Sequence, residues 1–258
     1  MRFNSDQIQK IGKEISSKVD GKTLFDEFSR GRYSTDASVY QIKPLGVVLP
    51  KDTNDVLSLM EYSQKNSVPL LARGGGSSQC GQTVGESVVL DYSKHQNKIL
   101  ELNVEEKYVW VQPGVVLDHL NDYLKPHGLW FPVDVSTSSR ATIGGMSANN
   151  SCGSRSLYYG NMVHNVLAIE AILDDGSIFQ FDQINKNYLA TKNNQDRLYK
   201  IIDKFIDVRQ KVGSEIDANW PTTQRRVGGY NIDLIDPEGF NSSNLLVGSE
   251  GTLSLIHI

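Results

Sequence analysis

Residues 69–81 read PLLARGGGSSQCG, an apolar run followed by Arg73, three glycines and two serines. Because the glycines at 74–76 carry no Cβ, the backbone there can adopt positive φ and bring its N–H groups close to an anion. Arg73 adds positive charge, and the hydroxyls at 77 and 78 add donors. Taken alone, the stretch fits an ordinary glycine-rich loop better than a phosphate site, so its context has to decide.

Spacing excludes two common phosphate-binding loops. A G-x-G-x-x-G motif that starts at Gly74 needs glycine at position 79, where the chain has Gln79, and the residues that follow lack helical periodicity. A Walker loop needs Gly-Lys-Ser/Thr, but Gln82 follows Gly81. The sequence therefore predicts neither a Rossmann turn nor an ATP- or GTP-binding loop.

Composition indicates an ordered protein that is weakly acidic. The chain has 258 residues, 39% of them hydrophobic and 22% charged, enough for one large or two small domains. Its net charge of -4 and scattered Lys and Arg exclude the basic field that nucleic acid requires. No apolar run approaches the roughly 20 residues of a membrane span, and the start MRFNSDQIQK lacks a signal-peptide core. We expect a cytoplasmic protein with no transmembrane segment.

Cysteines and histidines are too few and too scattered for a metal centre. Cys80 and Cys152 lie far apart in sequence and form no C-x-x-C pair, so we expect two free thiols. The five histidines show no metal-ligand spacing. The sequence predicts no metal site.

Strands and helices alternate in the first part of the chain. Isoleucines and a valine recur at helical spacing over residues 5–20 and predict an amphipathic helix. A strand at 46–50, a helix at 53–66 and a strand at 67–72 then predict a β-α-β unit. This unit leads directly into the triple glycine, which we therefore expect at the carboxyl end of a strand.

The same patterns predict the elements further along the chain. We expect a strand at 87–91, a hairpin or meander of 98–104 and 107–114, a helix over 116–128, a hairpin of 166–173 and 177–181, and a helix over 196–213 that ends at Gly213.

A second small-residue segment covers residues 133–161 and reads VDVSTSSRATIGGMSANNSCGSRSLYYGN. As a linker it would separate domains, but Ile143, Met146, Leu157 and two adjacent tyrosines give it packing anchors that Gly/Ser linkers lack. We therefore expect a long functional loop.

Four segments in order carry a resemblance to a known family: RGGGSS, VSTSSRATIGGMSANNSCG, YYGNMVHNVLAIEAILDDG and LLVGSEGTL. Over residues 30–258 the chain resembles the FAD-linked oxidase domain of the vanillyl-alcohol-oxidase/p-cresol-methylhydroxylase superfamily. Within it, the chain is most similar to the D-lactate, glycolate and D-2-hydroxyglutarate dehydrogenases. The segment RYSTDASVYQIKPLGVVLP is similar to large members that carry an iron–sulfur region further on.

This resemblance implies an α+β fold of the PCMH type, not Rossmann, in which two α+β subdomains clasp FAD. We divide the chain into a helical extension at 1–29, a first FAD-binding subdomain at 30–95 and a second at 96–258. Some members attach FAD through a histidine in the first loop, where this chain has Ser77. The resemblance therefore implies noncovalent FAD.

The resemblance also assigns FAD contacts to both loops. The first loop would wrap the pyrophosphate with backbone N–H groups, and the second would add backbone and side-chain donors. Ile169 would offer backbone hydrogen bonds to the adenine, and Glu250 with Gly251 would approach the flavin or ribityl chain. The implied FAD-binding residues are Arg73, Gly74, Gly75, Gly76, Ser77, Ser78, Gln79, Gly81, Pro132, Ser136, Thr137, Thr142, Gly144, Gly145, Asn149, Gly153, Ser154, Tyr159, Gly160, Ile169, Glu250 and Gly251.

The activity that the resemblance implies is oxidation of a D-2-hydroxy acid such as lactate, glycolate or 2-hydroxyglutarate to the 2-oxo acid, with hydride transfer to flavin N5. The motif QRRVGGYN offers Arg225 and Arg226 near the flavin, but a basic turn explains it equally well. No residue is assigned a catalytic role. The chain ends soon after GSEGT, without the cap domain that would bring a substrate-binding arginine and a catalytic histidine. We expect a fragment that is inactive alone and needs a cap or a partner subunit, an iron–sulfur one among the candidates.

Three alternatives stay open at this point. The chain could be a non-catalytic FAD-binding or electron-transfer subunit, part of an FAD oxidase of alcohols, sugars or ether-lipid precursors, or a nucleotide-binding module without redox chemistry.

Overall fold

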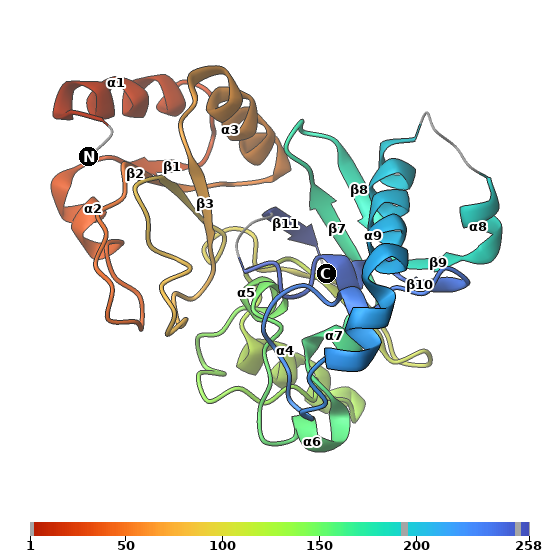
Figure 1. The fold of residues 1–258 in the computed structure, drawn as a ribbon. Helices are drawn as coiled ribbons and strands as arrows, with labels where there is room; N and C mark the ends of the chain where they lie inside the picture. The colour runs from red at the N-terminus through yellow and green to blue at the C-terminus, as the bar shows by residue number, and fades with distance from the viewer. Residues whose placement is uncertain (1–2, 192–195, 251–253, 258) are drawn as a thin grey trace.

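The first half of the chain forms a four-stranded sheet with strand order β1-β2-β4-β3 (Figure 1). In the computed structural model, which describes residues 3–191 and 196–250 and the backbone of 254–257, these strands are β1 Lys22–Leu24, β2 Gly46–Leu49, β3 Leu70–Arg73 and β4 Val88–Asp91. β2, β4 and β3 are parallel, and β1 is an antiparallel edge strand. The predicted β-α-β unit is confirmed, but β4 lies between its two strands.

Helices cover this sheet. α3 (Thr53–Asn66) connects β2 to β3, and α1 (Ser5–Ser16) packs on the same half through Ile8, Ile11 and Ile15. A capping box formed by Asn4 and Gln7 starts α1. The segment that we separated as an N-terminal extension thus contributes a helix and an edge strand to the first half.

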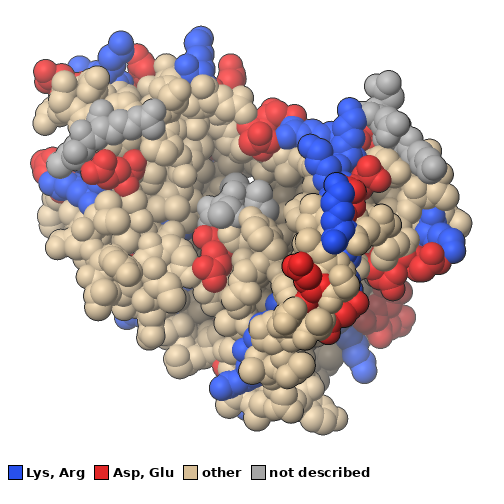
Figure 2. Space-filling model, in the orientation of Figure 1, with Lys and Arg blue, Asp and Glu red and all other residues tan. Residues whose placement is uncertain are grey.

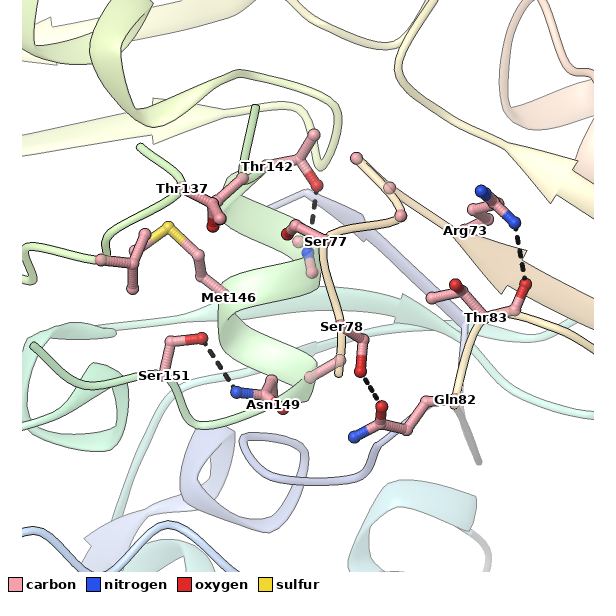
Figure 3. A pocket seen from close by; sticks show the side chains of 18 of the residues that line it. Arg73, Ser77, Ser78, Gln82, Thr83, Thr137, Thr142, Met146, Asn149 and Ser151 are labelled. Atoms are coloured by element: carbon pink, nitrogen blue, oxygen red, sulfur yellow. Dashed lines mark hydrogen bonds between the residues drawn. The ribbon is translucent and has the colours of Figure 1, made fainter. Parts of the chain in front are cut away.

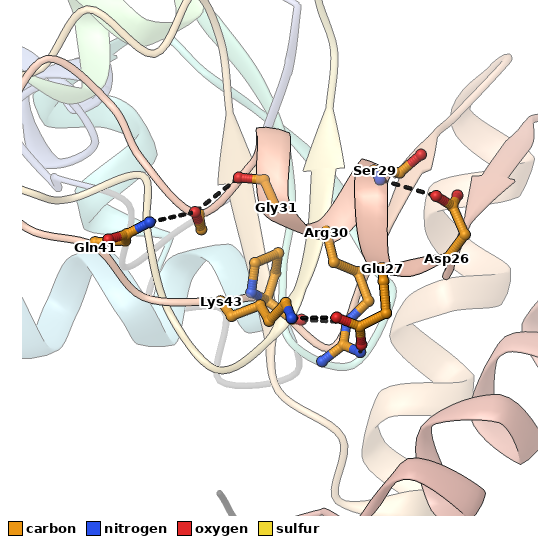
Figure 4. A network of polar contacts seen from close by, with 9 residues as sticks. Asp26, Glu27, Ser29, Arg30, Gly31, Gln41 and Lys43 are labelled. Atoms are coloured by element: carbon orange, nitrogen blue, oxygen red, sulfur yellow. Dashed lines mark hydrogen bonds and ion pairs between the residues drawn. The ribbon is translucent and has the colours of Figure 1, made fainter.

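A short helix, α2 (Glu27–Arg32), is tied to the chain that enters β2 by a buried cation (Figure 4). Arg30 is 5% exposed; its Nε donates to the Pro44 carbonyl at 2.8 Å and its Nη1 to Glu27 Oε1 at 2.7 Å. Glu27 also pairs with Lys43. A buried guanidinium with neutralised charge holds the α2 backbone. After α2, the Ala37 N–H donates to the Gly76 carbonyl in the glycine loop at 3.2 Å.

The second half combines a hairpin, a three-stranded antiparallel sheet and helices. Its sheet has the order β11-β7-β8, and the predicted hairpins are confirmed. The elements are β5 Ile99–Asn103, β6 Tyr108–Val111, α4 Leu117–Leu124, η1 Lys125–His127, β7 Ile169–Ile172, β8 Ile178–Phe181, β9 Gln183–Asn185, α8 Lys186–Ala190, α9 Arg197–Asn219, η2 Ile232–Leu234, β10 Gly239–Asn241, η3 Ser242–Leu245 and β11 Ser254–His257.

Two sequence predictions are wrong in their extent. α9 continues past Gly213 to Asn219, because Ile216 extends the buried face of the helix. Gly213 therefore lies inside the helix, where an added Cβ would meet only the flexible end of Arg209. The segment 133–161 is not all loop. It contains α5 Ile143–Ala148 and α6 Ser156–Tyr159, and α7 Met162–Asn165 follows it. Helices this short carry too few turns to show periodicity in a sequence.

Three apolar clusters hold the molecule together. One lies under the first sheet, one joins α4, α5, α7 and β7, and a smaller one packs α9 against β9 and β10. Ile172 of β7, 2% exposed, belongs to the first cluster, so it links the second half to the first. Acidic and basic side chains are interspersed on the face shown in Figure 2. Among the described residues, no helix is long and apolar enough to cross a membrane.

Candidate functional site

A cavity of about 430 Å³ lies where the two halves meet, and both small-residue segments line it (Figure 3). Residues 72–83, which begin at the end of β3 and continue into the glycine loop, form one wall. Residues 135–152, which include α5, form the other. Val227 and Glu250 also reach the cavity. The two loops that the sequence singled out therefore share one crevice.

The glycines let the two walls touch. A Cβ on Gly74 would lie 2.1 Å from Thr142 Oγ1, and a Cβ on Gly75 would lie 2.1 Å from the carbonyl oxygen of Arg140. Gly76 has φ +63°, in the left-handed region that other residues rarely adopt. The first loop needs glycine because it lies against the backbone of the second.

The first wall presents free backbone donors. Among the described residues, no hydrogen bond is made by the N–H groups at 75–78. Two N–H groups of the second wall already have partners within the protein. Gly144 N–H donates to the Pro113 carbonyl at 2.9 Å, and Gly145 N–H donates to Thr142 Oγ1 at 3.3 Å. Four consecutive free N–H groups on a cavity wall form a site suited to phosphate oxygens.

Arg73 holds the first wall in place. Its guanidinium donates to the carbonyl of Thr83 at 3.2 Å (Figure 3). It also donates to the carbonyls of Thr35 at 2.8 Å and Tyr33 at 3.3 Å, and it lies over the Tyr33 ring. Burial lowers the pKa of the Arg73 guanidinium, and burial together with the hydrogen bond to Asp91 raises the pKa of Tyr33. Arg73 thus fixes the loop by binding carbonyls on both sides of it.

A polar chain closes one edge of the cavity. Ser78 Oγ donates to Gln82, and Gln82 Nε2 donates to Glu250 Oε2 at 3.4 Å. Glu250 has φ +49°, and its N–H donates to the Ala148 carbonyl at 2.7 Å. Among the described lining residues, Arg73 and Glu250 are the charged ones.

The cavity collects most of the residues that the sequence assigned to FAD. Its lining includes Arg73, Gly74, Gly75, Gly76, Ser77, Ser78, Gln79, Ser136, Thr137, Thr142, Gly144, Gly145, Asn149 and Glu250. Their contacts with FAD stay predictions.

Other predicted residues lie outside the lining. Those described are Gly81, Pro132, Gly153, Ser154, Tyr159, Gly160 and Ile169, whereas Gly251 lies outside the described residues. Gly153 and Ser154 pack on Asp134, whose carboxylate accepts from Ser154 Oγ at 2.6 Å. Tyr159 stacks edge-on against Trp130, and Ile169 is fully buried in β7.

Sequence reasoning missed several lining residues. Tyr92 and Pro113 follow β4 and β6, and Cys80 and Cys152 lie within the two loops. Val227 belongs to the QRRVGGYN motif, which did point to this region. No sequence pattern indicates that Tyr92 and Pro113 line the cavity, because their position there depends on how the ends of distant strands meet.

The arginines before Val227 have partners. Arg226 makes two hydrogen bonds to the Asp233 carboxylate, at 2.7 and 2.9 Å, and lies over the Trp220 ring. Arg225 Nη1 donates to the Gly153 carbonyl at 3.1 Å. The Arg225 contact attaches this segment to the second small-residue segment, whereas the Arg226 contacts stay among residues 220–233.

Comparison with known proteins decides the family. Residues 44–182, more than half of the chain, match the sequence family described as FAD binding domain. The chain belongs to this family of FAD-binding domains. A D-2-hydroxyglutarate dehydrogenase of Escherichia coli (strain K12) is 36% identical over 246 residues, which are 92% of this chain and 24% of that protein. One of Haemophilus influenzae is 35% identical, over 86% of this chain and 23% of that protein.

One further relative and one solved structure are also similar to the chain. The glycolate oxidase subunit of Bacillus subtilis (strain 168) is 35% identical over 67% of this chain and 38% of that protein. An alkyldihydroxyacetonephosphate synthase structure superposes with a TM-score of 0.66 at 18% identity, covering 96% of this chain and 39% of that one. These findings confirm the α+β fold of the PCMH type and FAD as the cofactor. The FAD-binding domain spans about a quarter of the length of the dehydrogenases that it matches.

Proposed function

We propose that this FAD-binding domain is the cofactor-binding portion of a dehydrogenase that oxidises a D-2-hydroxy acid, such as 2-hydroxyglutarate, lactate or glycolate, to the 2-oxo acid. The observation that carries the proposal is the shared cavity, in which a glycine wall with free N–H donors faces a second wall of small residues. The substrate class is supported by the relatives, which include several D-2-hydroxyglutarate dehydrogenases.

The residues present fit FAD. The free N–H groups at 75–78 would hold its diphosphate, and the glycines at 74 and 75 let the loop that carries these groups pack against the second wall. Met146, Val135 and Pro113 give the cavity an apolar portion that excludes water from a ring system. When bound, FAD supplies an acceptor for the hydride that leaves the α-carbon of the substrate. We propose noncovalent binding, since Ser77 occupies the position of the histidine that attaches FAD in some relatives.

The hydroxyl proton needs a base that the cavity does not present. None of the four histidines with described side chains lines the cavity, and Glu250, which does, is committed to Gln82. We therefore propose that the base and the groups that bind the substrate carboxylate come from outside the described residues, in a cap or a partner subunit.

Binding is tested by titrating the purified domain, freed of flavin, with FAD, ADP and riboflavin. Binding should change the flavin fluorescence of FAD and raise the unfolding temperature, ADP should bind more weakly, and riboflavin should bind weakest because it lacks the diphosphate. A domain that binds ADP as tightly as FAD would instead be a nucleotide-binding module. A domain that binds neither would refute the proposal.

A second candidate, an FAD-binding or electron-transfer module without turnover, is favoured by the absence of a histidine from the described lining of the cavity. The two are separated by mixing the FAD-loaded protein anaerobically with D-2-hydroxyglutarate, D-lactate or glycolate. Loss of the visible flavin absorption shows that these residues suffice for oxidation. An unchanged spectrum, in a protein that dithionite still reduces, shows that the reaction needs further polypeptide.

A further inference from the structure

Both cysteines of the chain lie on the wall of the FAD cavity, one on each loop. Cys80 follows the serines of the first loop and is exposed, whereas Cys152 lies on the second loop and is half-buried, and both are free thiols. We propose that these thiols make the cavity a site of thiol modification, in which a mixed disulfide with a small thiol and bound FAD exclude each other. The inference rests on the proposed binding of FAD in this cavity.

Cys80 is connected to the donors that would hold the diphosphate. Its backbone N–H donates to Ser78 Oγ at 3.2 Å, and Ser78 in turn donates to Gln82. The free N–H groups at 75–78 precede it directly. A group added to Cys80 therefore lies next to the surface that a dinucleotide needs.

Cys152 cannot move its backbone away from the cavity. On one side, the Ser151 N–H donates to the Met146 carbonyl at 2.9 Å, and Ser151 Oγ accepts from Asn149 at 3.1 Å. On the other side, Gly153 lies so close to Asp134 that an added Cβ would be 1.6 Å from the Asp134 carbonyl oxygen. Because the chain is held on both sides of a lining residue, a group attached to its sulfur stays at the cavity wall.

The modification needs no oxidant besides a small disulfide, for which oxidised glutathione is the probe. The cysteine thiolate attacks one sulfur of the disulfide, a new S–S bond forms to the protein, and the original S–S bond breaks. The other half leaves as a thiolate, so the protein sulfur is oxidised while one small thiol is released. The carboxylates of the attached tripeptide are anions, which compete for the same backbone donors as a diphosphate.

The experiment exposes the flavin-free protein to oxidised glutathione with and without saturating FAD. Peptide mass spectrometry gives the modification of each cysteine, and flavin fluorescence gives the FAD affinity. We expect FAD to slow modification of both thiols at least tenfold, the modified protein to bind FAD at least tenfold more weakly, and dithiothreitol to restore binding. N-Ethylmaleimide, a second thiol probe, should show the same protection.

Variants separate the two thiols from other effects. The double variant Cys80→Ser/Cys152→Ser defines a baseline, and its FAD affinity, measured before and after oxidised glutathione, should not change. In each single variant, oxidised glutathione should still weaken FAD binding, but less than in the unmodified protein. A loss of binding that persists in the double variant would assign the effect to another residue and overturn the inference.

Two further results would overturn it. One is a protein with both thiols modified and an unchanged FAD affinity. The other is a folded protein whose cysteines resist both reagents and react only after unfolding. If the untreated protein does not bind FAD, the proposed function fails first, and the initial titration shows this before any thiol is modified.

Discussion

At the scale of single residues, the site depends on glycines, whose lack of a Cβ lets two loops approach each other. The first loop can reach the second because Gly74 and Gly75 have no Cβ, and its N–H groups stay free because nothing in the described chain binds them. Arg73, in contrast to the glycines, acts through its side chain. Its large side chain is used for structure, bonding carbonyls at Tyr33, Thr35 and Thr83. The sequence RGGGSS suggests that Arg73 binds an anion, but in the structure its guanidinium binds backbone carbonyls and holds the loop in place.

Replacing Gly75 by alanine should separate the two walls. The new methyl would lie 2.1 Å from the Arg140 carbonyl oxygen, so the backbone has to shift, at a cost of about 1–3 kcal/mol of stability. We expect FAD affinity to fall by at least about tenfold, which corresponds to roughly 1.4 kcal/mol. Fluorescence titration and denaturant unfolding measure both effects. The matched control is Gly31→Ala, where a Cβ meets nothing within 4 Å. Unchanged FAD affinity in Gly75→Ala would contradict the close-packing argument.

Replacing Arg73 by lysine keeps the charge but loses the planar donor fork. A lysine ammonium cannot reach three carbonyls placed on different segments, so the half-buried carbonyls of Tyr33 and Thr83 and the exposed carbonyl of Thr35 cannot all keep their donor, at about 1–3 kcal/mol. We expect lower stability together with weaker FAD binding, measured by the same two methods. Arg140→Lys, at an exposed side chain on the opposite wall, is the control. If Arg73→Lys binds FAD like the unmodified protein, charge alone is sufficient.

At the scale of elements, the β-α-β unit places the glycine loop. β3 lies beside β4 in parallel register, from Leu70 opposite Val88 to Arg73 opposite Asp91, so the loop starts at the carboxyl edge of the sheet. The helix α3 that precedes it ends at Ser67 in the left-handed conformation, with φ 53°. Loop position therefore depends on a helix end, which local sequence predicts, and on a strand register, which the tertiary structure decides.

Replacing Ser67 by glycine should stabilise the protein. Left-handed backbone is unfavourable for a residue with a Cβ and natural for glycine at a helix C-terminus, so we expect a gain of about 0.5–1 kcal/mol in the free energy of unfolding. Denaturant unfolding measures it. Ser17→Gly is the matched control, because Ser17 ends α1 with right-handed φ of −84° and should be destabilised by glycine. Destabilisation at Ser67 as well would show that its side chain matters more than its backbone conformation.

At the scale of the whole molecule, the cavity lies between two halves with separate cores that are joined by Ile172. Neither half contains the whole site, since one supplies the donor wall and the other the wall around α5. A ligand that touches both walls adds contacts between the halves. The position of the cavity thus makes cofactor binding and the cohesion of the molecule depend on each other.

FAD should therefore stabilise both halves together. At a free concentration about 100-fold above its Kd, a single bound ligand adds roughly 2.7 kcal/mol to the unfolding free energy. We expect amide hydrogen exchange to slow in residues 72–83 and in residues 135–152, which line opposite walls. ADP, used as the reference ligand, should protect both segments less. Protection confined to one of them would mean that FAD is held by that wall alone.

Local sequence determined much of this protein. Glycines, apolar periodicity and turn residues act within a few positions, and they correctly indicated the β-α-β unit, both hairpins and the two segments that line the cavity. Only the tertiary structure decided that the walls touch at Gly75, that Tyr92 and Pro113 join the lining, that the Arg73 guanidinium binds carbonyls, and that both cysteines lie on one cavity. The reason is physical: these features require chain segments far apart in sequence to pack together, and no local preference records which distant surfaces will meet.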